Sequence, residues 1–172
     1  AAIEWQTDQG AFVDWARFRL RGGDDLAPVS EAYAALRGAV AARRARLAKR
    51  FAGMLAQGGG HDWSPSPRIV PVENALAELV APLAASHPVL LLVMDGLSVS
   101  IFRELFADLA ALSWSEWVRS DLGHALTGVA AFPTVTEVSR ASLLAGTVTT
   151  GGSGQEKSAF AAHPALLAHS NA

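Results

Sequence analysis

The stretch Val89-Leu90-Leu91-Leu92-Val93-Met94-Asp95-Gly96 decides the fold that we expect for this chain. Its first six residues are all apolar, without alternating polar side chains, which is typical of a strand buried on both faces in a parallel sheet. Asp95 follows at the carboxyl end of the strand, where open α/β sheets bind their ligands. Gly96 has no side chain and lets backbone or ligand approach closely. The pattern predicts a site around Asp95, although position alone fits equally well with an acid that caps the next helix.

A second stretch, residues 132–146 (Phe-Pro-Thr-Val-Thr-Glu-Val-Ser-Arg-Ala-Ser-Leu-Leu-Ala-Gly), is expected to form another edge of the same site. A Pro-Thr-x-Thr turn leads into a helix from Thr136 to Leu144, which ends near Gly146 as the C′ residue. The hydroxyl groups of Thr134 and Thr136 meet the free N–H groups of a helix N-terminus here, and such an end suits an anion. Threonine also often caps helices, so neither hydroxyl is specific by itself.

Length, composition and charge limit the class of protein. The 172 residues are enough for one domain with a sizeable core, and 51% hydrophobic with 17% charged residues fits a globular protein. The formal net charge of -2 gives no global basic field that would favour nucleic acid. The absence of cysteine excludes disulfides and thiolate metal sites. The longest apolar run is far shorter than the ~18 residues of a membrane span, and we expect a cytoplasmic protein.

Residues 1–87 are expected to be mostly helical, with helices over 3–20, 28–56 and 71–87. Residues 58–68, rich in Gly, Ser and Pro, form a linker or exposed loop. The second helix carries a basic cluster: Arg43, Arg44, Arg46, Lys49 and Arg50. The cluster has two interpretations, a patch for phosphate or nucleic acid and a solvated helix face. The second is favoured because the net charge is not basic.

Strand and helix alternate from residue 88 onward. The elements expected after the first strand are helices at 98–112, 136–144 and 155–169 and a short strand at 125–132. The apolar side chains of the helix at 98–112 are expected to face the sheet. This order is that of a parallel α/β unit.

Asp95 and Thr136 together indicate chemistry that neither indicates alone. Carboxylates bind divalent cations such as zinc. A metal that also contacts a hydroxyl oxygen helps it to lose its proton and become a nucleophile. A helix N-terminus beneath them would stabilise the charge of a phosphate. An acid and a threonine from neighbouring strand ends therefore make half of a metallophosphatase site.

These motifs resemble the alkaline phosphatase superfamily. In its nucleotide pyrophosphatase/phosphodiesterase branch, a similar strand ends in Asp-Gly, and a Pro-Thr-x-Thr segment ends in Gly with the spacing of residues 132–146. Three further motifs resemble more specifically the PglZ domain of bacterial phage-exclusion (BREX and Pgl) systems: Ser139-Arg140, Ser142-Leu143-Leu144-x-Gly146 and Gln155-Glu156-Lys157-x-x-Phe160. The resemblance covers about the second half of the chain.

The resemblance implies that residues 88–172 are the first part of a three-layer α/β/α core, preceded by the helical region. It also implies a metal-dependent phosphatase or phosphodiesterase with two divalent metal sites, usually zinc. Asp95 would bind metal, and Thr136 would be both metal ligand and nucleophile, with Thr134 as the near alternative. Ser139 stands where the phosphodiesterase branch has an Asn that binds the phosphate. This departure puts a substrate contact of Ser139 in question.

The superfamily completes its metal site with Asp and His residues much further downstream than Ala172. His163 and His169 lack the Asp-x-x-x-His setting, so we expect neither to bind metal. We therefore expect a fragment that is inactive alone. The implied partners are other phage-defence proteins and a nucleic-acid or nucleotide phosphodiester, with no membrane. The alternative is a non-catalytic interaction module that docks other subunits of a defence complex.

Overall fold

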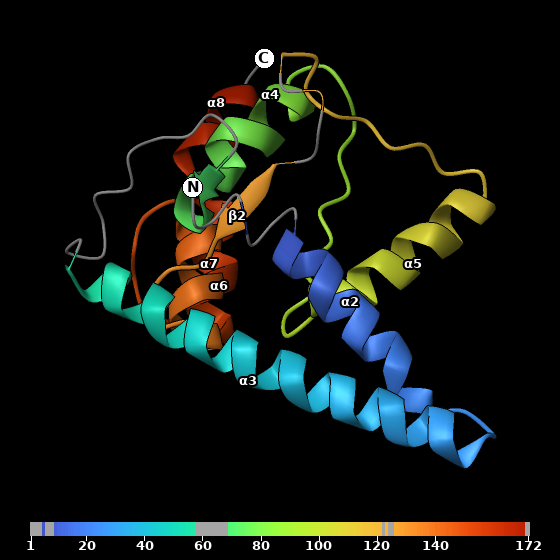
Figure 1. The fold of residues 1–172 in the computed structure, drawn as a ribbon. Helices are drawn as coiled ribbons and strands as arrows, with labels where there is room; N and C mark the ends of the chain where they lie inside the picture. The colour runs from blue at the N-terminus through green and yellow to red at the C-terminus, as the bar shows by residue number, and fades with distance from the viewer. Residues whose placement is uncertain (1–4, 6–8, 58–68, 122, 124–125, 171–172) are drawn as a thin grey trace. The chain divides into compact units, whose positions relative to one another are not determined.

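The computed structural model describes residues 5, 9–57, 69–121, 123 and 126–170 (Figure 1). The expected loop at 58–68 therefore lies outside the described residues. The chain forms two compact units, Ala1–Ser64 with Leu97–Trp117 and Pro65–Gly96 with Val118–Ala172. The boundary expected between residues 87 and 88 falls inside the second unit. Among the described helices, none has both the length and the apolar composition needed to cross a bilayer.

The first unit is helical. Its elements are α2 (Ala11–Arg19), the 3-10 turn η2 (Leu20–Gly22), α3 (Ala27–Gln57) and α5 (Val99–Ala111). Helix α5 starts where the sequence predicts, because the Ser98 hydroxyl accepts a hydrogen bond of 3.3 Å from the N–H of Ile101. That α5 faces the sheet stays a prediction, because α5 belongs to the first unit and the sheet to the second. Helix α5 packs against α2, and the Trp15 indole N–H donates a hydrogen bond of 2.6 Å to Glu104 Oε1.

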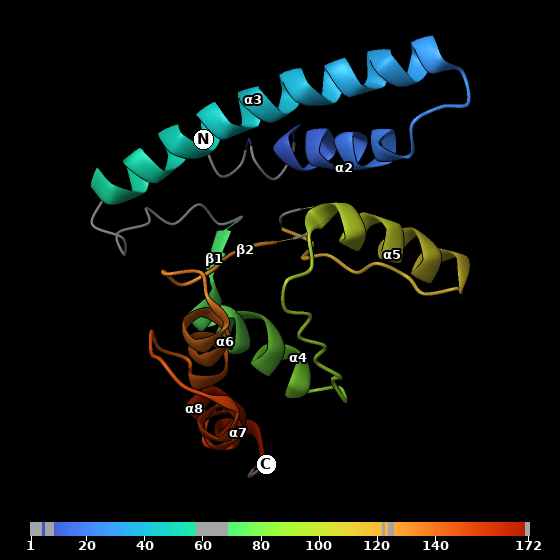
Figure 2. The ribbon, with the colours of Figure 1, turned by 90° about the horizontal axis from the view of Figure 1, so that it is seen from below.

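Helix α3 is a single helix of 31 residues, close to the predicted span of 28–56. Arg44 joins it to α2 by donating hydrogen bonds of 2.9 and 2.8 Å to the two carboxylate oxygens of Asp14. Arg37 donates a longer hydrogen bond, 3.4 Å, to the carbonyl of Arg21. Figure 2 shows α2 lying along one side of α3.

The second unit contains a small parallel sheet of two strands, β1 (Ile69–Pro71) and β2 (Thr127–Val129). The segments after β1 are η3 (Val72–Asn74), the π-helical η4 (Leu76–Val80) and α4 (Ala81–Ala84), and those after β2 are α6 (Thr136–Ala145), α7 (Ser153–Ala161) and α8 (Pro164–Ser170). Leu76 is fully buried, and Val70 and Ala141 are also buried. The helices α4, α6, α7 and α8 group beside β2 (Figure 1).

Residues 89–94 do not form the predicted buried strand. They connect α4 to Asp95 without regular secondary structure, and five of their six side chains are exposed, Leu90 by 79% and Leu92 by 68%. The strand that pairs with β2 is instead Ile69–Pro71, which lies between the loop expected at 58–68 and the helix expected at 71–87 and overlaps that helix at Pro71. A strand buried on both faces needs neighbours at its edges and covering layers. In the described residues of the second unit, β1 and β2 pair with each other, and no strand pairs with residues 89–94.

The remaining elements of the second unit follow the sequence more closely. Strand β2 lies inside the predicted range 125–132 but keeps only three residues. Helix α6 matches the predicted 136–144, and Gly146 ends it in the left-handed conformation with φ of +72°. The single helix predicted at 155–169 is two helices, α7 and α8, because Pro164 cannot continue the first one.

Candidate functional site

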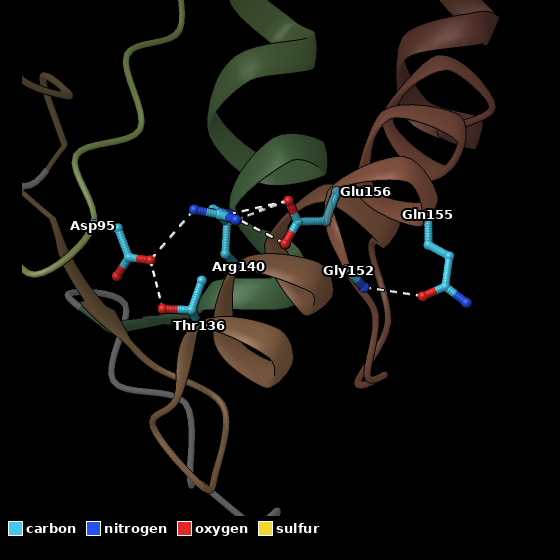
Figure 3. Close-up of polar contacts among 6 residues, drawn as sticks. All are labelled: Asp95, Thr136, Arg140, Gly152, Gln155 and Glu156. Carbon is cyan, nitrogen blue, oxygen red and sulfur yellow. Dashed lines mark hydrogen bonds and ion pairs between the residues drawn. The ribbon is translucent and has the colours of Figure 1, made fainter.

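Asp95 and Thr136 are 41 residues apart in the sequence and meet in the second unit. The Thr136 hydroxyl donates a hydrogen bond of 2.8 Å to Asp95 Oδ2 (Figure 3). The Asp95 side chain is 45% exposed and Thr136 is half-buried, so solvent reaches the pair. The structure thus brings together the carboxylate and the hydroxyl on which the expected chemistry depends.

Thr136 is the first residue of α6, and the helix start around it is open. Val135 precedes the helix with φ of -99° and ψ of 156° and gives no side-chain hydrogen bond to the first turn. Its carbonyl accepts from the N–H groups of Val138 and Ser139 at 3.1 and 2.8 Å. The N–H groups of Thr136 and Glu137, the first two residues of α6, have no acceptor within the helix, and the positive end of the helix dipole lies here. An acid such as Asp95 is favourable at this end.

Arg140, one turn further along α6, lies between Asp95 and a buried acid of α7 (Figure 3). Its Nε and Nη2 contact the carboxylate of Glu156 at 3.1 and 3.0 Å, and its Nη1 is 3.4 Å from Asp95 Oδ2. The Glu156 side chain is only 7% exposed. The hydrogen bond to Glu156 raises the pKa of the Arg140 guanidinium above its ordinary value, although desolvation opposes this effect. Glu156 therefore holds the charged guanidinium of Arg140 in place beside Asp95.

The start of α7 fixes the position of Glu156. The N–H of Gly152 donates a hydrogen bond of 2.9 Å to Gln155 Oε1, and the N–H of Gly151 donates one of 2.8 Å to the carbonyl of Glu137. Ser142 is fully buried in α6, where it accepts from the N–H of Thr149 at 3.0 Å. These contacts hold the loop before α7 to α6.

Arg140 and Glu156 belong to the site, although the sequence predicts no role for either of them. Both belong to motifs that carry the PglZ resemblance, Ser139-Arg140 and Gln155-Glu156-Lys157. An arginine and an acid 16 residues apart give no local signal of pairing, so only those motifs could have pointed to them.

The other predicted residues lie less centrally. Thr134 is exposed in the turn before α6, and in the part of the chain that the structure describes no hydrogen bond joins it to Asp95. Ser139 is half-buried in the first turns of α6. His163 is buried against Gly146, and neither of its ring nitrogens has a hydrogen-bond partner among the described residues. The side chain of His169 lies outside the described part of the structure.

The described residues do not fit a metal by themselves. No group of three or more His, Asp or Glu side chains that could hold an ion occurs among them. Asp95 and Thr136 supply two oxygens, whereas a catalytic zinc takes about three protein ligands and a water. Arg140 also occupies part of the space beside the same Asp95 oxygen.

No protein-family model, no curated protein and no solved structure matches the chain. Function is therefore inferred from the chemistry of the site. A hydroxyl that donates to a carboxylate, beside a fixed guanidinium and an open helix N-terminus, has the parts needed for attack on a phosphorus centre.

Proposed function

We propose that this chain carries the nucleophile of a phosphate-ester hydrolase, a phosphatase or phosphodiesterase of the PglZ type within the alkaline phosphatase superfamily. The observation that supports this proposal is the 2.8 Å hydrogen bond from Thr136 to Asp95 at the start of α6. On this proposal the protein acts in the cytoplasm in bacterial phage defence, with other defence proteins as partners and a nucleotide or nucleic-acid phosphodiester as substrate. The divalent metal implied by the resemblance would need ligands in addition to these two residues.

The proposal also places the second unit in a larger three-layer α/β/α core. The two strands β1 and β2 would be part of a wider sheet, and residues 89–94 would be another of its strands. The support is the composition of that segment. Its side chains are apolar without alternation, and most of them are exposed.

The proposed reaction begins with attack of Thr136 Oγ1 on phosphorus, while the hydroxyl proton passes to Asp95 Oδ2, which already accepts it in a hydrogen bond. The new O–P bond gives a phosphothreonine from a monoester, or an ester of phosphothreonine from a diester, as the bond to the leaving ester oxygen breaks. The leaving oxygen takes the proton held by Asp95 and departs as an alcohol. Water then hydrolyses the phosphothreonine and restores Thr136. Arg140 and the first N–H groups of α6 would bind the phosphoryl oxygens.

Hydrolysis of bis(4-nitrophenyl) phosphate and 4-nitrophenyl phosphate by the full-length protein tests this proposal. We expect Thr136→Val and Asp95→Asn each to lower the rate by about 100-fold or more, since each removes a partner of the proton transfer. Thr134→Val is the matched control and should keep its activity. Mass spectrometry of acid-quenched protein should find phosphate on Thr136 after reaction with 4-nitrophenyl phosphate, and a 4-nitrophenyl phosphoryl group there after reaction with the diester. Equal loss of activity in Thr134→Val and Thr136→Val would contradict the assignment of the nucleophile.

The second candidate function is a non-catalytic docking module. It is favoured by the exposed apolar side chains of 89–94 in the second unit and, separately, by Trp117, which is 92% exposed in the first unit. Docking of this kind would survive Asp95→Asn and would be lost with Leu90→Ser/Leu92→Ser. A pull-down of the defence partners with both variants separates the two functions.

A further inference from the structure

Helix α3 carries a group of exposed cations that the proposed hydrolase does not use. We call Arg43, Arg46, Lys49 and Arg50 the basic face. At ~100° per residue, these four positions fall within an arc of about 120° around the helix. In the part of the chain that the structure describes, none of the four makes a hydrogen bond or an ion pair. The only acid of α3, Glu31, lies more than two turns before Arg43.

Hydrogen bonds within the protein explain the arginines on the opposite side of α3, but they do not explain the cations of the basic face. Arg44 binds Asp14 and Arg37 binds the carbonyl of Arg21, and both arginines lie opposite the centre of the basic face. The half-buried apolar side chains of α3 share their side of the helix: Tyr33, Val40, Leu47 and Phe51. The basic face therefore points away from the contacts that hold α3 to α2.

Compensation of the helix dipole does not explain these cations either. A dipole acts on charges within the last turn of a helix. Helix α3 ends at Gln57 and has no basic residue in its last turn, since Arg50 is seven residues from the end. The net charge of -2 excludes a global basic field but says nothing against a local one.

We propose that the basic face of α3 binds the phosphate backbone of a nucleic acid. Four cations over about 11 Å of helix axis meet a duplex that carries one negative charge in about 1.7 Å. Between Ala32 and Gly53 the other side chains on this arc are small, so the helix can approach a strand closely: Ala32, Ala35, Ala39, Ala42 and Gly53. Glu31 lies at the edge of the same arc, but more than two turns before Arg43. The contact would be electrostatic and independent of base sequence.

A membrane surface is the competing partner for a basic helix, and the arrangement of side chains argues against it. A helix that lies in a bilayer surface buries large apolar side chains below its cations. Among the residues of α3 whose side chains the structure describes, none of this kind lies on the arc of the basic face, and Leu36 lies just outside it. The apolar stripe of α3 is instead half-buried on the side of Arg37 and Arg44.

Fluorescence anisotropy of the full-length protein with a labelled 20-base-pair DNA duplex tests the proposal. For four phosphates we expect a slope of about -3.6 in log K against log salt, or about a 150-fold loss of affinity from 50 to 200 mM salt. Replacing all four residues (Arg43→Gln, Arg46→Gln, Lys49→Gln, Arg50→Gln) should remove most of this slope and weaken binding at 50 mM salt by 100-fold or more. Gln is a good helix former, so circular dichroism should show an unchanged helix content.

The matched control removes the same number of exposed cations elsewhere: Arg21→Gln, Arg103→Gln, Arg119→Gln and Lys157→Gln. It should bind the duplex within about two-fold of the unsubstituted protein, because phosphate contacts act locally. Equal losses in the two quadruple variants would overturn the proposal. So would binding to vesicles that contain phosphatidylserine without binding to DNA. Thr136→Val should bind DNA normally, so failure of the hydrolase proposal and failure of this one give different results.

Discussion

The guanidinium of Arg140 lies between two carboxylates, 3.0 Å from the buried Glu156 and 3.4 Å from the exposed Asp95. The shorter and better enclosed contact fixes the arginine, and the longer one ends on Asp95 Oδ2, the oxygen that also accepts from the Thr136 hydroxyl. Glu156 on α7 therefore holds in place the arginine that contacts Asp95, the acceptor of the Thr136 hydroxyl.

We expect Glu156→Gln to weaken this control without removing volume. The neutral amide leaves the charge of Arg140 without its main partner, so hydrolysis should fall by about ten-fold and the melting temperature by several degrees. Thermal unfolding of Arg140→Ala, Glu156→Ala and the double variant measures the coupling. Two residues in direct contact should show losses that are clearly not additive. Additive losses would mean that the two side chains act independently.

Gly146 should not tolerate a side chain. Its φ is +72°, and an added Cβ would run into the imidazole of His163. We expect Gly146→Ala to destabilise the protein by about 2 kcal/mol or more, since the left-handed conformation alone costs about 1–2 kcal/mol. Urea unfolding gives the value. Gly154→Ala is the control, because Gly154 lies in α7 with open space around it, and there alanine should stabilise by about 0.5–1 kcal/mol.

His163 should be replaceable by an apolar residue. The ring is buried, and its nitrogens have no hydrogen-bond partner among the described residues. We expect His163→Leu to be neutral or to stabilise by up to about 1 kcal/mol, because it removes an unsatisfied buried polar group. His163→Ala should lose about 2 kcal/mol or more by leaving a cavity. A large loss in His163→Leu, measured by urea unfolding, would show that the nitrogens are hydrogen-bonded in solution.

Substitutions in residues 89–94 distinguish the larger three-layer core from the docking module. In a three-layer core its leucines would be buried, and Leu90→Ser/Leu92→Ser should destabilise the full-length protein by about 4 kcal/mol or more. Leu26→Ser, at a position that is exposed in the first unit, should change stability by less than about 0.5 kcal/mol. An equally small change in the double variant would contradict the larger core and favour the docking module.

Local signals predicted the start of α5 and the end of α6, whereas the helix predicted at 71–87 is the short segments η3, η4 and α4. The hydroxyl of Ser98 and the missing side chain of Gly146 mark the ends of α5 and α6 within a residue or two, because capping depends on neighbours in the sequence. The break between α7 and α8 is an exception, because the sequence pattern predicts one helix through Pro164, whereas α8 begins at this residue.

The sheet could not be predicted in the same way. Strand β1 has three residues, too few for a period-2 pattern, and its partner is 58 positions away at Thr127. The composition of 89–94 predicts a buried strand, but burial depends on what packs against it and not on composition. The meeting of Asp95 with Thr136 was expected, whereas the pairing of Arg140 with Glu156 gave no sequence signal beyond the motifs that contain them.

Arg140 and the two acids that it contacts have formal charges that do not cancel. Asp95 and Glu156 contribute two negative charges and Arg140 one positive charge, which leaves an excess of one negative charge beside the hydroxyl of Thr136. A phosphomonoester, which is a dianion at neutral pH, would be repelled more strongly than a singly charged diester. For the hydrolase that we propose, this excess negative charge should favour diesters, such as internucleotide linkages, over terminal phosphate monoesters.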